Sequence, residues 1–247
     1  MVSLCPSITR LLFDLDAGHM LVGITKYCIH PAEAVANIEK VGGTKDPDIA
    51  QISQLKPDLI LLNKEENRRE DWQALKNLNL TCHSTHPVTL DETVETVRSI
   101  GAALNRDEVA ERVAHGIEEA RLRALKKNTN SLSFVYLIWR KPWMTINANT
   151  YINCLLQACG GTNVFADAQT CYPAIETDQI KDANPDMVLL SSEPFPFKEK
   201  HIQELSTKTG LDSGKFRIVD GELLSWHGAF TEKGLDYACE LFSTGNS

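Results

Sequence analysis

The chain has 247 residues, of which 43% are hydrophobic and 23% charged, which is usual for a globular protein of one large or two small domains. Its formal net charge of −8 argues against a nucleic-acid-binding protein, because such proteins carry basic patches. No apolar run approaches the roughly 20 residues that a membrane-spanning helix needs.

The start of the chain reads as the end of a first strand, Ser3 to Cys5, with no signal peptide before it. This predicts either an intracellular protein or a chain that begins at a mature N-terminus. The seven cysteines form no C-x-x-C pair, so neither a zinc ribbon nor a thioredoxin motif is expected. Mostly reduced thiols are the default expectation, which favours the cytosol.

The first half of the chain alternates predicted strands and helices. A helix is expected after Pro6, with apolar residues at helical spacing from Ile8 to Leu15 and Ser7 as its cap. Further elements are expected as strands at 21–25, 59–62 and 80–84 and a helix at 90–104. Such alternation predicts a parallel α/β sheet.

The longest uninterrupted helical pattern runs from Asn105 to Asn128. It contains no proline, and its apolar residues fall on one face, with charges elsewhere: Val109, Val113, Ile117, Ala120 and Ala124. The second half then resumes the alternation, with strands expected at 132–139, 187–190 and 218–219 and helices at 151–158 and 231–242.

One pattern occurs twice. Residues 54–62 read QLKPDLILL and residues 182–190 read DANPDMVLL, and each follows a short helix-like segment. The proline ends the helix, and the apolar run suits a strand buried on two faces. The repeat predicts two doubly wound α/β lobes, residues 1–104 and 129–247, joined by a connecting helix over residues 105–128, with a ligand cleft between the lobes.

Ligands in open α/β sheets bind beyond the carboxyl ends of the strands. This rule selects loops at 5–7, 27–31 and 63–67 in the first lobe and at 139–143, 171–173, 191–194 and 225–227 in the second. They carry aromatic side chains suited to a flat conjugated ligand, namely Trp139, Trp143, Tyr172 and Trp226. Ordinary packing is the alternative, most of all for Trp139, which falls on a strand.

The same loops hold residues that can bind a transition metal. Cys28, His30 and His227, with an oxygen from Glu65 or Glu66, offer the thiolate, imidazole and carboxylate groups that suit zinc or iron. The alternative is a partly buried cysteine and a loop histidine. A histidine can also serve as the axial ligand to a metal held in a macrocycle.

Five stretches, in order, resemble the substrate-binding proteins of iron-siderophore, haem and cobalamin ABC transporters, also called helical-backbone metal receptors. The cobalamin-binding members are the most similar. The matching stretches are Val2–Thr9, Leu21–Tyr27, Leu55–Ile60, Cys159–Phe165 and Asn184–Asp186. The resemblance implies two α/β lobes joined by one long rigid helix, and a periplasmic or membrane-associated location.

The resemblance also implies roles for particular residues. Tyr172 falls where an aromatic residue faces the corrin, and His30 falls where a tyrosine does. Asp178 matches an acidic residue that docks on the membrane permease, while Ala50 stands at the equivalent place in the first lobe. Some relatives carry a disulfide at the positions of Cys159 and Cys239. The expected ligand-binding set is Tyr27, His30, Glu66, Trp143, Tyr172, Trp226 and His227.

We therefore expect a monomeric, non-catalytic protein that binds cobalamin, haem, a siderophore or another metal chelate, with no intrinsic cofactor and with an ABC permease as partner. One alternative is an intracellular metal or corrinoid sensor or chaperone that does not dock on a permease. Another is a metal-dependent enzyme using Cys28, His30 and His227. Against the enzyme, the sequence contains no G-x-S-x-G, H-E-x-x-H, G-x-G-x-x-G or P-loop pattern.

Overall fold

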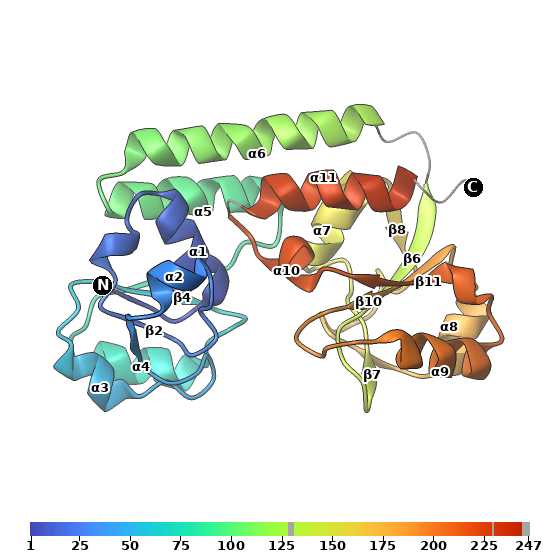
Figure 1. Ribbon diagram of the computed structural model, residues 1–247, viewed down its shortest axis with the longest axis horizontal. Helices are drawn as coiled ribbons and strands as arrows, with labels where there is room; N and C mark the ends of the chain where they lie inside the picture. The colour runs from blue at the N-terminus through green and yellow to red at the C-terminus, as the bar shows by residue number, and fades with distance from the viewer. Residues whose placement is uncertain (128–130, 229, 244–247) are drawn as a thin grey trace. The chain divides into compact units, whose positions relative to one another are not determined.

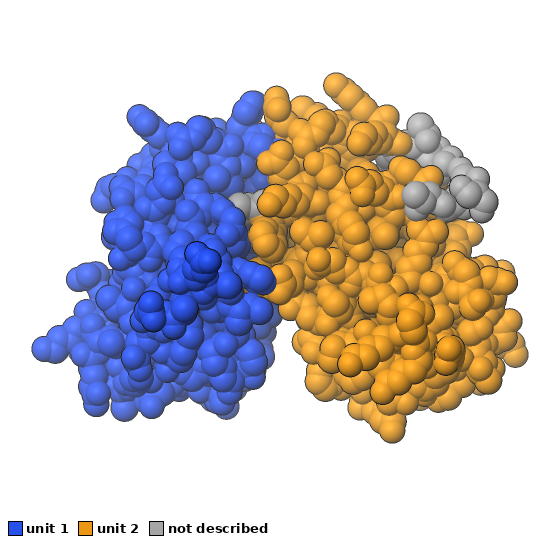
Figure 2. All heavy atoms as spheres, in the orientation of Figure 1, with its two compact units in different colours: residues 1–87, 91–117, 227–229 blue, residues 88–90, 118–226, 230–247 orange. Residues whose placement is uncertain are grey.

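The structure, a computed structural model, describes residues 1–127, 131–228 and 230–243 (Figure 1). The chain packs as two compact units (Figure 2). Unit 1 contains residues 1–87 and 91–117, together with His227 and Gly228. Unit 2 contains residues 88–90 and 118–226 and the helix that begins at Phe230.

Unit 1 is built on a five-stranded sheet in which all neighbouring strands are parallel. The order β3-β2-β1-β4-β5 puts the first strand of the chain at the centre. The strands are β1 (Val2–Ser3), β2 (Gly23–Ile24), β3 (Glu39–Lys40), β4 (Ile60–Asn63) and β5 (Cys82–Thr85). The helical segments are α1 (Pro6–Asp14), η1 (Gly18–Met20), α2 (Ala32–Val35), α3 (Ile49–Gln54), α4 (Arg69–Asn77) and α5 (Leu90–Ala103).

The side chains of β4 show why this sheet needs helices on two faces. Leu61 packs in a cluster with apolar residues of α1 and α5. Ile60 and Leu62 point to the opposite face and pack with Ile52 of α3 and Leu75 of α4. Alternate residues of a strand point to opposite faces, so a continuous apolar run requires cover on each side.

Unit 2 contains a four-stranded parallel sheet of order β11-β10-β6-β8 and a separate antiparallel pair, β7-β9. The strands are β6 (Leu132–Leu137), β7 (Trp143–Met144), β8 (Gly161–Asn163), β9 (Ala174–Ile175), β10 (Met187–Ser191) and β11 (Phe216–Val219). The helical segments are α7 (Tyr151–Ala158), α8 (Thr177–Ala183), α9 (Glu199–Thr209), η2 (Ser213–Lys215), α10 (Gly221–Ser225) and α11 (Phe230–Ser243). Alternate residues of β10 again enter two different apolar clusters.

The two copies of the repeat are strands of two different sheets, β4 in unit 1 and β10 in unit 2. Each follows a helix, α3 or α8, and a residue with positive φ, Lys56 at 46° or Asn184 at 39°. The proline comes directly after that residue, where a left-handed turn has already ended the helix. The repeated sequence therefore encodes one helix-to-strand turn, and the predicted pair of α/β lobes is confirmed.

Helix α6 (Asp107–Lys127) is unbroken over 21 residues, which confirms the long helix predicted there, although Asn128 lies outside the described residues. Its first half, to Ile117, packs in unit 1, and its second half, from Glu118, packs in unit 2. Ala110 and Ala114 enter the core of unit 1, and Ala120 and Ala124 enter that of unit 2. The boundaries 1–104, 105–128 and 129–247 stay a prediction, since packing divides the helix itself.

The predicted cap of α1 is wrong. The helix begins at Pro6, so Cys5 is its N-cap and Ser7 lies inside the first turn. Proline is favoured at the first helical position, where its missing N–H is not needed. Within residues 1–127, 131–228 and 230–243, no helix has the length and apolar character needed to cross a bilayer.

Cys159 and Cys239 lie next to each other, as expected from the resemblance. The two sulfur atoms are 2.9 Å apart, between the end of α7 and the body of α11, and both residues are buried with free thiols. Cys159 also donates to the backbone carbonyl of Leu235. The pair is therefore placed so that oxidation can join it without a change of fold.

We expect mild oxidation with oxidised glutathione to join Cys159 and Cys239 and to raise the free energy of unfolding by up to about 4 kcal/mol, because the bond closes a long loop in the unfolded chain. Thiol titration, peptide mass spectrometry and urea unfolding measure this. Cys171→Ser should oxidise like the wild type, and Cys159→Ser should not. Equal stability before and after bond formation would contradict the expectation.

Candidate functional site

The loop after β2 in unit 1 presents an aromatic and an aliphatic side chain to solvent. Tyr27 and Ile29 are each 52% exposed, whereas Cys28 between them is buried. His30 follows and is half-buried. Lys26 lies over the Tyr27 ring, with Nζ 5.2 Å from its centroid, and forms an ion pair with Asp46 at 3.5 Å. This loop offers a large ring beside a cation.

Cys28 faces away from that surface. Its sulfur lies 3.0 Å from Thr9 Oγ1 and 3.1 Å from Thr25 Oγ1, inside the apolar core of unit 1. Burial raises the pKa of the Cys28 thiol, so the thiolate that a metal requires is disfavoured. Among the described residues there is no group of three His, Cys, Asp or Glu side chains able to hold a metal ion. The structure therefore does not bring Cys28, His30 and His227 together as a metal site.

The loop after β4 is shaped by two asparagine side chains. Asn63 Oδ1 accepts from the backbone N–H groups of Glu65, at 2.9 Å, and Glu66, at 3.2 Å. Asn67 accepts from the backbone N–H of Asn63 and donates to the carbonyls of Leu4 and Thr44. These bonds satisfy the backbone of the turn, in which Asn63 and Asn67 are buried and part of the Glu66 side chain is exposed. The pKa of Glu66 is raised, chiefly by loss of hydration, while Lys45 opposes this.

His227 packs in unit 1, although it lies near the end of the chain. Its Nε2 atom is 3.1 Å from Asn63 Nδ2 and 3.5 Å from Ser7 Oγ. The Nδ2 atom of Asn63 can only donate, so Nε2 accepts and the imidazole is neutral. Burial, with a smaller contribution from His86, lowers the pKa of His227 to about 4. His227 is therefore a buried anchor of the strand-end region and offers little surface to a ligand.

In unit 2, Trp226 follows helix α10 and is hydrogen-bonded to Glu193 in the loop after β10. The indole Nε1 donates to Glu193 Oε1 at 2.8 Å, and Ser225 Oγ donates to the same oxygen at 2.9 Å. The indole also stacks on Phe230, with ring centroids 5.6 Å apart. Only 8% of Trp226 is exposed, so its main role in this structure is to pack.

Trp143, the other tryptophan expected to line a cleft, is buried as well. It is 8% exposed and stacks on Phe197 at 6.0 Å, inside an apolar cluster of unit 2. Trp139 is the exception, since it is 41% exposed. The sequence favoured a packing role most of all for Trp139. In the structure, Trp143 and Trp226 are the tryptophans that pack inside the unit, and Trp139 is exposed.

Tyr172 lies half-buried in the segment that leads into β9. The carbonyls on each side of it are fixed, because Cys171 accepts from the Asn147 N–H at 2.9 Å and Pro173 accepts from the Thr145 N–H at 3.1 Å. Arg140, which also lies in a strand-end loop, is bound to Glu204, whose Oε2 accepts from its Nε at 2.9 Å and its Nη2 at 2.7 Å. Asp178 is exposed in the first turn of α8, and Ala50 is exposed on α3.

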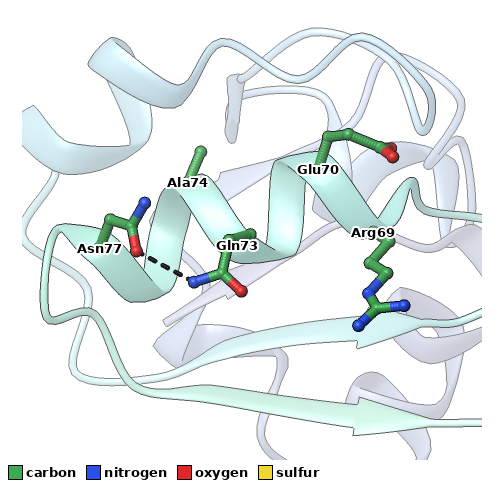
Figure 3. Close-up of a pocket in the computed structure, with 5 residues that line it drawn as sticks. All are labelled: Arg69, Glu70, Gln73, Ala74 and Asn77. Carbon is green, nitrogen blue, oxygen red and sulfur yellow. Dashed lines mark hydrogen bonds between the residues drawn. The ribbon is translucent and has the colours of Figure 1, made fainter.

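A surface hollow runs along α4. Figure 3 shows its lining, which comes from one helix alone: Arg69, Glu70, Gln73, Ala74 and Asn77. The Gln73 amide donates to Asn77 Oδ1 at 3.0 Å. None of the residues predicted to bind ligand lines this hollow.

The chain belongs to the periplasmic binding protein family, whose profile matches residues 1–213. It is a ligand-binding protein by family and fold. It is 26% identical over 192 residues to a vitamin B12-binding protein of Vibrio cholerae, covering 77% of this chain and 69% of that protein.

Solved structures share the whole fold. The periplasmic vitamin B12 binding protein of Vibrio cholerae superposes with a TM-score of 0.84 at 22% identity, covering 100% of this chain and 97% of that one. The periplasmic heme-binding protein RhuT of Roseiflexus sp. RS-1 gives a TM-score of 0.86 at 20% identity, covering 99% and 98%. The resemblance inferred from the sequence is confirmed.

Sequence patterns assigned no role to two residues of the site region, although the selected loop at 63–67 contains the first of them. Asn67 holds the β4 loop from four residues beyond the strand, and Phe195 contacts Trp139 from the β10 loop. Their only sequence signal is their position just after a predicted strand.

We expect the free energy of unfolding to fall as the pH drops from about 6.5 to about 4, because the pKa of His227 is about 4 in the folded protein against 6.5 unfolded. The unfolded chain binds a proton in this window that the folded chain does not. At pH 5 this costs about 2 kcal/mol relative to pH 7.5.

Urea unfolding at several pH values measures this loss. His227→Gln should flatten the dependence by about that amount, whereas the exposed His19→Gln should follow the wild type. Identical pH dependence in wild type and His227→Gln would show that His227 does not titrate in this way.

Proposed function

We propose that this protein binds a metal chelate with a broad planar ring, of the cobalamin or haem kind, and presents it to an ABC permease. Two observations together support the proposal. The strand-end loops expose aromatic faces, and the described residues contain no three-ligand metal group. A ligand that brings its own metal needs apolar faces more than it needs protein ligands. The vitamin B12-binding and heme-binding relatives support this class of ligand.

In this proposal the ligand contacts come from Tyr27, His30 and Glu66 in unit 1 and from Tyr172 in unit 2. These side chains are exposed or half-buried at the strand-end loops. His227, Trp143 and Trp226, which the sequence analysis also expected to bind ligand, are buried and support the strand-end loops of their own units. A planar macrocycle buries several hundred Å² of apolar area at roughly 25 cal/mol per Å², and ordering costs reduce the net gain.

The proposed route of delivery rests on Asp178. Its side chain is exposed in the first turn of α8, where a carboxylate can meet an arginine of a membrane protein. In unit 1 the equivalent Ala50 cannot do this, but Asp46 and Asp48 are exposed close to it in the chain. In this proposal the protein is a non-catalytic monomer with no cofactor of its own, and it acts on the periplasmic side of a membrane.

The binding half of the proposal is tested by titrating the wild-type protein with cyanocobalamin and with haemin and following the visible absorption bands. We expect one of the two to bind, and Tyr27→Ala to weaken that binding by roughly tenfold, since an exposed ring is lost. Cys28→Ser should bind as the wild type does, because Cys28 faces the core. Loss of binding in Cys28→Ser alone would show that metal ligation dominates.

The docking half predicts that Asp178→Lys abolishes co-purification with the cognate permease in detergent while leaving ligand affinity unchanged. Asp182→Lys, an exposed change at the other end of α8, is the matched control and should co-purify normally. Normal co-purification of Asp178→Lys would remove this residue from the interface.

A further inference from the structure

Four aromatic rings in unit 2 form a continuous series from the core to the surface. Trp143 stacks on Phe197, with ring centroids 6.0 Å apart and planes at 7°. Phe197 meets Phe195 edge to face at 4.8 Å, and Phe195 meets Trp139 edge to face at 5.7 Å. Trp143 and Phe197 are buried, at 8% and 4% exposed, Phe195 is half-buried, and Trp139 is 41% exposed. We call these four residues the aromatic series.

The base of the series is firmly packed. His201 contacts the rings of Phe195 and Phe197, at 5.3 and 5.5 Å. His201 Nδ1 accepts from the backbone N–H of Lys198 at 2.9 Å, so this imidazole is neutral and packs as an aromatic ring. Burial lowers the pKa of His201, with Lys200 and Arg140 acting in the same direction. The Arg140 guanidinium lies 5.7 Å from the centre of the Trp143 ring and is held by Glu204. Trp139 thus rests on a support that cannot easily shift.

The strand order explains how the loop after β10 contacts two tryptophans that follow the strands on either side of β10. β10 lies between β6 and β11. Trp139 follows β6, and Trp226 follows β11 after the short helix α10. From the loop after β10, Phe195 contacts Trp139, and Glu193 accepts the Trp226 indole hydrogen bond. The loop therefore positions one exposed indole and one buried indole at the carboxyl edge of the same sheet.

An exposed tryptophan that is already held in place loses little side-chain entropy when a ligand covers it. Phe195 meets Trp139 in a T-shaped contact, and 41% of Trp139 stays exposed beside this contact. The exposed part of the indole is an apolar stacking surface. Such a surface suits a planar conjugated ring and has no special fit for a compact metal ion or a flexible chain.

We propose that Trp139 is a specificity-determining residue that stacks on the planar ring of the ligand, with Phe195 as the residue that positions it. The inference rests on the proposed function, because it names the residue of unit 2 that distinguishes a planar ligand from a non-planar one. It replaces Trp143 and Trp226 as the tryptophans in direct contact with ligand.

The experiment compares two substitutions of similar size in the full-length chain. Trp139→Phe keeps a planar face, while Trp139→Leu keeps apolar bulk without one. Each is titrated with haemin and with cyanocobalamin beside the wild type and the control Leu125→Ala, an exposed apolar residue on α6. We expect affinity within about threefold of wild type for Trp139→Phe and roughly 10- to 100-fold weaker for Trp139→Leu. Leu125→Ala should match the wild type.

The outcomes separate the two proposals. Wild-type protein that binds neither compound overturns the proposed function, and this inference falls with it. Wild-type binding that is unchanged in Trp139→Leu overturns the inference alone. Equal loss in Trp139→Phe and Trp139→Leu also overturns it, because stacking on a flat face would then not be the interaction. Phe195→Leu offers a second measurement: with Trp139 intact but unsupported, affinity should fall by roughly threefold to tenfold.

Discussion

Burial of β4 and β10 between two layers of apolar side chains is the constraint on which the structure depends. Alternate residues of each strand enter different clusters, so a shift of one residue in register would exchange the two faces of the strand. Each strand is also entered through the same turn, a left-handed residue followed by Pro-Asp. With register and entry fixed, Asn63 at the end of β4 and Glu193 just past β10 have fixed positions as well.

The strand-end loops depend on those positions through hydrogen bonds to single side chains. Asn63 holds the backbone of the β4 loop and contacts His227, while Glu193 holds Ser225 and Trp226. Because buried polar groups require partners, each bond excludes alternative loop conformations. The exposed ring of Trp139, which Phe195 of the β10 loop contacts, is therefore supported by a part of the chain that the core itself orients.

Much of the fold could be predicted from the sequence, since it follows from local patterns. The Pro-Asp repeat predicted two lobes, and apolar spacing predicted α6 and α7 to within a few residues. The helix start at Pro6 was missed because Ser7 and Pro6 both favour a helix N-terminus, and only the backbone decides between them.

The candidate site could be predicted only in part, because burial of a loop residue depends on contacts far away in the sequence. Trp139, Trp143 and Trp226 look alike in a strand-end loop. Phe197 covers Trp143, and Phe230 with Glu193 covers Trp226, whereas the edge-on contact of Phe195 leaves Trp139 exposed. Cys28 turned inward for a similar reason, since Thr9 and Thr25 supply polar partners within the core.

His227 belongs to unit 1 but is synthesised after residues 118–226 of unit 2. Unit 1 is otherwise complete once residue 117 has been made, but its strand-end region lacks the imidazole that contacts Asn63 and Ser7. That residue leaves the ribosome only after almost the whole of unit 2. During translation, the strand-end region of unit 1 therefore lacks this buried contact until most of unit 2 has been made.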